Sequence, residues 1–277
     1  ASLLWEELDQ TAYLSGPYRQ PVLGTPESLE RIDAAALRDY YDRHYAPGAC
    51  LLVVAGDVTE DALLSALIHT FVNDRRPADG DSPPPPPTER AEGVSRRIDK
   101  DVKEAYLALA WPAPPIARRE DVYAMDVLTC ILGNGRSSRL YREVKDRRRL
   151  VSTIGAHCSP QAHPSLLTVS ATLPPGGAGA AREAILEQIR RVRQGVSGRE
   201  VRRARRMIRA GLEFALETPA GRARSIGYYR LLTGSDEFLN TYLDRIENVC
   251  AADVVRVARE YLDPDKAVEV LIAPPGQ

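Results

Sequence analysis

The chain has 277 residues, of which 44% are apolar and 27% charged, and its formal net charge at pH 7 is -1. These values are typical of a globular protein with one large or two modest domains, and the near-zero charge gives no reason to expect nucleic acid or an anionic membrane as a partner. The four cysteines are scattered singly, so neither a disulfide framework nor a zinc ribbon is predicted. No run of about eighteen apolar residues is present, so no membrane span is expected.

Residues 2–13, SLLWEELDQTAY, predict a helix with Leu3, Leu4 and Leu8 on one side. A start inside a helix indicates a fragment or a processed chain, so a targeting segment would lie upstream of Ala1. The compartment, periplasmic or cytoplasmic, is therefore left open.

Three further elements are predicted before residue 75. They are a helix at 28–45, a buried strand at 49–55 and a helix at 59–71. The strand is inferred from the sequence ACLLVVA, which is too short for a helix, rich in Val and Leu, and bounded by Pro-Gly and Gly-Asp turns.

Residues 76–95 contain five consecutive prolines, Pro83 to Pro87, among polar residues. Such a segment cannot pack a core and is expected to be an extended linker. A proline-rich peptide ligand is the functional alternative, but a spacer between two globular patterns is preferred. The linker would divide a first domain, residues 1–75, from a second, residues 96–277.

The second domain is predicted to mix strands with long amphipathic helices. The strands are expected at 96–98, 105–111, 150–156, 165–173 and 267–273, and the helices at 121–132, 180–193, 199–217, 222–232, 236–246 and 251–261. An internal echo relates the two domains, because the segments starting at Arg31 and Arg245 both give a helix ending at Tyr, a Pro-centred turn and a closing strand. The expected class is α+β, each domain having a mixed, mainly antiparallel sheet packed with helices.

Two stretches carry a family resemblance. Residues 131–156, ILGNGRSSRLYREVKDRRRLVSTIGA, give a turn, a basic helix and a strand, and residues 17–63 run from PYRQPVLGTPESL to AGDVTEDAL. Both resemble the pitrilysin/insulinase family of zinc peptidases, which includes the mitochondrial processing peptidases and bacterial two-subunit proteases. The resemblance implies tandem metallopeptidase-like domains, with residues 1–75 closing the catalytic-type domain and residues 96–277 forming the non-catalytic one.

The resemblance also implies two substrate-binding positions. In peptide-binding members an Arg ends the helix and a Tyr follows seven residues later, and both hold the substrate backbone; the matching residues are Lys145 and Ser152. Lys lacks the bidentate fork of a guanidinium, and Ser lacks the reach and ring of Tyr, so the pair is degenerate here. The chain then fits the zinc-bearing half of such an enzyme, with unfolded peptide as substrate and either a homologous subunit that carries the Arg/Tyr pair or a second copy as partner.

No catalytic residue and no metal ligand is predicted in this chain. The family's His-x-x-Glu-His zinc motif does not occur among its four histidines, and in relatives it lies upstream of the segment that begins here. Zinc is thus expected in the full-length protein, although truncation and true absence of the motif stay open. His157, Cys158 and His163 form the one cluster with metal-capable side chains, but their spacing matches no standard site.

The function implied by the resemblance is that of the inactive-domain portion of a zinc metalloendopeptidase, which degrades or processes unfolded peptides in a closed chamber. The chain would contribute chamber wall and subunit contacts, and it should be inactive alone. The alternative is a natural non-catalytic subunit or scaffold of a peptidase complex. A third hypothesis is nucleic-acid binding by the basic helix 199–209, which neighbouring glutamates and the lack of interleaved aromatic residues disfavour.

Overall fold

The computed structural model describes residues 2–45, 47–70 and 89–276. These residues fall into two compact units, each made of segments far apart in sequence. The first unit holds residues 2–20, 89–212 and 240–276, and the second holds 21–70 and 213–239. The predicted linker lies outside the described residues as far as residue 88, and the predicted division into domains at 76–95 stays a prediction.

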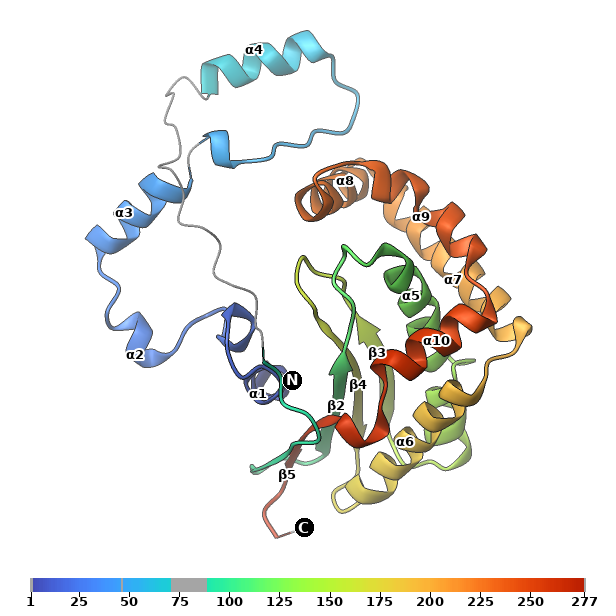
Figure 1. Ribbon diagram of the computed structural model, residues 1–277. Coiled ribbons are helices and arrows are strands. Elements are labelled where there is room, and N and C mark those ends of the chain that lie inside the picture. Colours follow the sequence, from blue (N-terminus) through green and yellow to red (C-terminus); the bar gives the residue numbers. More distant parts are fainter. Residues whose placement is uncertain (1, 46, 71–88, 277) are drawn as a thin grey trace. The chain divides into compact units, whose positions relative to one another are not determined.

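A five-stranded sheet organises the first unit (Figure 1). Its strands are β1 (Ser95–Asp99), β2 (Ala105–Pro112), β3 (Thr153–Cys158), β4 (Leu166–Leu173) and β5 (Val268–Ala273). The order across the sheet is β1-β5-β2-β4-β3, in which β1 runs parallel to β5 and every other neighbour is antiparallel. The mixed, mainly antiparallel sheet confirms the predicted fold class.

Helices cover both faces of this sheet. Successive side chains of a strand point to opposite faces, and β2 carries apolar side chains on both, so each face needs a covering layer. Leu107 and Leu109 of β2 are fully buried on the face that carries three helices, whereas Ala108 and Ala110 are buried on the other. The three helices are α5 (Arg119–Gly133), α6 (Ala178–Gln194) and α10 (Ala251–Tyr261), and they gather on one side of the sheet in Figure 1.

Helix α1 (Ser2–Ala12) covers the opposite face. Leu4, Leu8 and Ala12 recur at helical spacing and pack against the small alanines of β2 and against Val270 and Ile272 of β5. The end of the helix is held by an isolated bridge between Tyr13 and Arg90. The apolar side of the predicted N-terminal helix is thus buried on the sheet of residues 95–273.

The connection from α5 to β3 contains two unusual backbone features. Gly133 ends α5 so close to β3 that a Cβ there would lie 2.1 Å from the backbone nitrogen of Ala156. The chain then forms η3 (Tyr141–Arg147), a π-helix, and leaves it through Arg149 at a φ of 53°. The Leu150 amide still donates to the Val144 carbonyl oxygen of this helix at 3.0 Å, so the strand begins only at Thr153, and the predicted start at residue 150 is wrong.

The remaining helices of the chain include two that span both units, α7 (Gly198–Leu216) and α9 (Glu237–Asn248). In the first unit, buried polar groups tie the helices and loops together. The Trp111 indole donates to the Asp263 carbonyl oxygen at 2.8 Å, and the Tyr242 hydroxyl donates to Asp126 at 2.6 Å.

The second unit is helical in its described residues and departs from the prediction twice. Its complete helices are α2 (Pro26–Leu29), α3 (Ala34–His44), α4 (Glu60–Thr70) and α8 (Pro219–Thr233). The single helix expected at 28–45 is divided because the Asp33 carboxylate caps α3, accepting from the Ala36 amide at 2.7 Å. The strand expected at 49–55 does not form: no described strand pairs with it, and its side chains are mostly exposed.

Candidate functional site

A hollow of about 350 Å³ lies in the first unit between α1 and the strands β3 and β4. The strand register pairs Gly155 with Ser170 and His157 with Thr168, so these four residues face the same side of the sheet and form the floor. Trp5, Leu8 and Asp9 of α1 form the wall. Because Gly155 has no side chain, it leaves room above the floor.

The Asp9 carboxyl is the main electrostatic feature of this α1/β3/β4 hollow. It makes no hydrogen bond or ion pair with any described residue, and burial raises its pKa from 3.8 to about 6. At pH 7 it is still mostly ionised, so it presents an uncompensated negative charge to a ligand.

A second polar group, Ser165, also lines the hollow and is only 3% exposed. Within the described part of the chain its Oγ has no hydrogen-bond partner of ordinary geometry, although it lies near the Cys158 thiol, whose pKa burial raises to about 12. A buried hydroxyl without a partner costs free energy, so an occupant that bonds to it would recover that cost.

Aromatic rings line the remainder of the hollow. Trp5 is 39% exposed, whereas Tyr13 is buried beneath the Arg90 guanidinium, which lies 5.9 Å from the ring centroid. Burial raises the pKa of Tyr13, so its hydroxyl stays neutral. The hollow therefore joins an apolar rim to a partly buried carboxyl and a buried hydroxyl, a combination typical of ligand pockets.

The strand β3 that forms one side of the hollow is also an edge strand. Among the described strands it pairs with β4 alone, which leaves the hydrogen-bonding groups of its outer side without a strand partner. An extended peptide can add to such an edge through main-chain hydrogen bonds while its side chains enter a neighbouring pocket.

The two residues predicted to match the family's peptide-binding pair stand just before this strand and line no part of the hollow. Lys145 lies in η3 with its Nζ 5.1 Å from the centroid of the Tyr141 ring. The Ser152 hydroxyl lies 3.0 Å from Glu104 Oε1 and 3.2 Å from the Thr172 carbonyl oxygen. Both side chains have intramolecular contacts, and their role in binding stays a prediction.

Within 2–45, 47–70 and 89–276, no group of three or more His, Cys, Asp or Glu side chains could hold a metal ion. At the former candidate cluster, His157 points to the hollow side of the sheet, Cys158 keeps its proton, and His163 packs 6.4 Å from the Tyr18 ring. The described residues do not fit a zinc site.

Several arginines of the basic helix, now α7, are engaged within the first unit. Arg205 donates to the Val249 carbonyl oxygen, and Arg209 lies 3.2 Å from Glu247. These contacts reduce the charge that the helix offers to a polyanion.

The described helices also include none that is long and apolar enough to cross a membrane.

Sequence reasoning missed Asp9, Ser165 and Gly155 as members of one site. The sequence offers one local signal for this site, which is the alternation of residues 166, 168 and 170 in β4. It shows that these three residues share one face of the strand, but not which other residues pack against that face.

The chain resembles known proteins over nearly its whole length. An uncharacterized zinc protease of Rickettsia bellii is 24% identical over 98% of the chain, which spans 65% of that relative's length. A crystal structure of a protease from Helicobacter pylori gives a TM-score of 0.87 at 22% identity, covering 98% of this chain and 67% of the other. A chain of complex III2 from Candida albicans gives 0.83 at 18% identity, covering 98% and 66%.

The family description "Peptidase M16 inactive domain" matches residues 31–208, which is more than half of the chain. This match agrees with the mixed sheet and its helices, and it confirms the predicted pitrilysin/insulinase resemblance. The chain belongs to the peptidase M16 inactive-domain family.

Proposed function

We propose that this chain is the non-catalytic, substrate-contacting part of a zinc metalloendopeptidase that acts on unfolded peptides. It forms part of the wall of a closed chamber, and an extended peptide adds to the edge of β3 with side chains in the α1/β3/β4 hollow. The observation that carries the proposal is the outer edge of β3, with which no described strand pairs, beside a hollow lined by the Asp9 carboxylate and the buried Ser165 hydroxyl.

The zinc and its catalytic base belong, on this proposal, to a segment of the longer protein that precedes residue 1. Two facts support this. The Rickettsia relative is named a zinc protease and is longer than the present chain, and the described residues contain no ligand set of their own. Zinc would polarise the scissile carbonyl, while the present chain would position the peptide.

A homologous second subunit, or a second copy of the protein, completes the peptide grip. At the positions of the family's Arg and Tyr, Lys145 rests against a ring and Ser152 is engaged by Glu104, so neither side chain is well placed to hold a peptide backbone. Changing both to Ala should therefore leave peptide binding by this chain within about twofold of wild type. Mixing the intact zinc-bearing protein with its partner should raise the kcat/KM for an unfolded peptide by orders of magnitude. A natural scaffold subunit is the alternative, and it predicts no turnover in any mixture that lacks a separate zinc-bearing chain.

The peptide contact is tested by filling the hollow. A Gly155→Leu variant places a side chain above the floor, where a Cβ at residue 155 has no atom closer than 4.0 Å. Gly179→Leu makes the same change at an open position in α6 and serves as the control. Binding of fluorescein-labelled unstructured peptides, followed by anisotropy, should weaken at least tenfold in the first variant and stay unchanged in the second. Equal binding by both variants would refute the peptide contact.

A further inference from the structure

A separate hollow of about 500 Å³ lies in the first unit between η3, α6 and the start of α7. It is lined by charged and amide side chains from those three helices. None of its lining residues belongs to the α1/β3/β4 hollow or to the edge of β3.

The most buried residue that lines this η3/α6/α7 hollow is Gln188 of α6. Its side chain is 2% exposed, and its Nε2 has no hydrogen-bond partner among the residues that the structure describes. Burying an amide donor without an acceptor costs free energy. A bound group with an oxygen acceptor would recover that cost.

The ionic groups around the hollow leave an excess of positive charge. The lining itself holds three arginines and two glutamates, and the ion pairs add two arginines and one glutamate from outside it, so the five arginines exceed the three glutamates by two charges. The ion pairs are Arg139–Glu200, Arg147–Glu143, and Arg148 and Arg191 on the shared Glu187. The Arg142 guanidinium lines the hollow and makes no hydrogen bond or ion pair with any described residue.

Although burial favours the neutral acid, the hydrogen bonds from Arg139 and Ser197 hold the pKa of Glu200 at about 2. Glu200 therefore stays ionised, and its oxygens bond to Arg139, at 2.7 Å, and to the backbone amide and hydroxyl of Ser197. It keeps Arg139 in place and does not take up the charge of Arg142 or Arg191.

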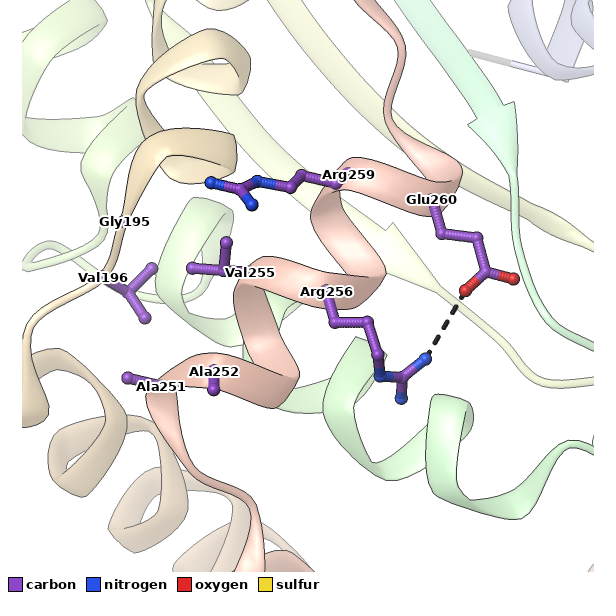
Figure 2. A pocket seen from close by; sticks show the side chains of 8 residues that line it. All are labelled: Gly195, Val196, Ala251, Ala252, Val255, Arg256, Arg259 and Glu260. Atoms are coloured by element: carbon purple, nitrogen blue, oxygen red, sulfur yellow. Dashed lines mark hydrogen bonds and ion pairs between the residues drawn. The ribbon is translucent and has the colours of Figure 1, made fainter.

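The groove on the outer side of α10 offers a contrast (Figure 2). There Arg256 is paired with Asp121 at 2.6 Å and with Glu260 at 3.5 Å, and Arg259 donates to the Arg193 carbonyl oxygen at 2.9 Å. Its arginines are satisfied, and no buried donor without a partner lines it. An anion has no comparable reason to bind at that groove.

We propose that the η3/α6/α7 hollow binds a dianion of phosphate size. Arg142 and Arg191 would supply the two compensating charges, and Gln188 Nε2 would donate to one of the anion's oxygens. A π-helix at one side of the site agrees with this, because such turns recur at functional sites. The phosphate is either the free ion or the phosphate group of a small ester.

The test compares phosphate with chloride at equal ionic strength. For the wild-type chain, inorganic phosphate should raise the unfolding temperature saturably, with a dissociation constant on the order of 1 mM. The same measurement is repeated with glycerol 3-phosphate. If it binds with an affinity similar to that of inorganic phosphate, the site is assigned to the free ion; if it binds more tightly, the site is assigned to a phosphate ester. Equal effects of phosphate, ester and chloride on the wild-type chain would overturn the proposal.

Two variants and a control separate the site from general charge effects. Arg142→Gln and Gln188→Leu should weaken phosphate binding at least about tenfold, because each removes a direct bond to the anion. Gln188→Leu should be at least as stable as wild type without phosphate, since it removes an unpaired buried amide. Arg206→Gln, an exposed arginine of α7 outside the hollow, should bind phosphate as wild type does. Undiminished binding by Gln188→Leu would overturn the assignment.

Discussion

The Asp9→Asn substitution tests the electrostatics of the α1/β3/β4 hollow through stability. The folded protein holds the pKa of this carboxyl at about 6, whereas an unfolded chain would leave it near 3.8. The folded state therefore binds more protons between these two values, and stability falls as pH rises through that window. Below about pH 3.8 the carboxyl is protonated in both states and costs nothing; above about pH 6 the full cost is present.

The size of the effect follows from the shift. Two pKa units correspond to about 2.7 kcal/mol at 1.36 kcal/mol each, and partial exposure of the carboxyl screens this to about 1 kcal/mol. Asn keeps the shape without the charge, so Asp9→Asn should be about 1 kcal/mol more stable than wild type at pH 7.5. For a chain of this size that is a rise of about 2–4 °C in unfolding temperature.

Urea unfolding of both proteins at pH 4.5 and pH 7.5 measures the difference. The gain should shrink to a few tenths of a kcal/mol at pH 4.5. Asp101→Asn, at an exposed position outside the hollow, is the control for the effect of the substitution itself. A variant that is no more stable than wild type at pH 7.5, or a gain of equal size at both pH values, would refute the reasoning.

Three other substitutions probe the frame around the sites. Gly133→Ala should cost more than about 2 kcal/mol in urea unfolding, because its Cβ would overlap the backbone of β3, whereas Gly211→Ala at an open helical position should stabilise by about 0.5–1 kcal/mol. Trp111→Phe should lower the free energy of unfolding by about 1 kcal/mol, because it removes the indole bond to the Asp263 carbonyl oxygen, which then keeps only the bond from the Lys266 amide; an unchanged urea midpoint would count against that bond. Glu200→Gln should destabilise by about 1 kcal/mol at pH 7, and the difference should vanish as pH falls toward about 2, as acid titrations of both proteins would reveal.

Periodicity predicted the elements of the first unit well because those elements bury one regular face each. The apolar side of residues 2–13 packs on the sheet, and the alternation in 105–111 separates the two faces of β2. The sheet's order and its parallel β1–β5 pair depend on contacts between segments about 170 residues apart, and sequence patterns alone do not encode them.

The wrong predictions have local causes. Residues 49–55 have strand composition, but a strand also needs a neighbour to bond its backbone, and none of the described segments supplies one. The helix expected at 28–45 is interrupted because the Asp33 side chain caps a new helix start. The late start of β3 follows from the left-handed Arg149 that ends the π-helix, which propensity does not anticipate.

Of the candidate site, the sequence predicted some of the backbone elements but not the residues that line the hollow. The segment 131–156 correctly pointed to η3 and β3, but Asp9 and Ser165 come together only because α1 packs on the sheet. Whether a buried carboxyl lacks a partner can be seen only when every neighbour is placed. The Gln188 site escaped prediction for the same reason, since a glutamine on a long helix is usually solvated.

The most direct test of the peptide-contacting role uses N-methylated peptides. A strand that adds to the edge of β3 donates the amide hydrogens of every second residue, so methylation of one alternate set should abolish binding and methylation of the other set should be tolerated. The two methylated forms of one binding peptide should therefore differ at least tenfold in dissociation constant for the wild-type chain, as measured by anisotropy. Equal dissociation constants for the two forms, or no binding of the unmethylated peptide, would contradict the account.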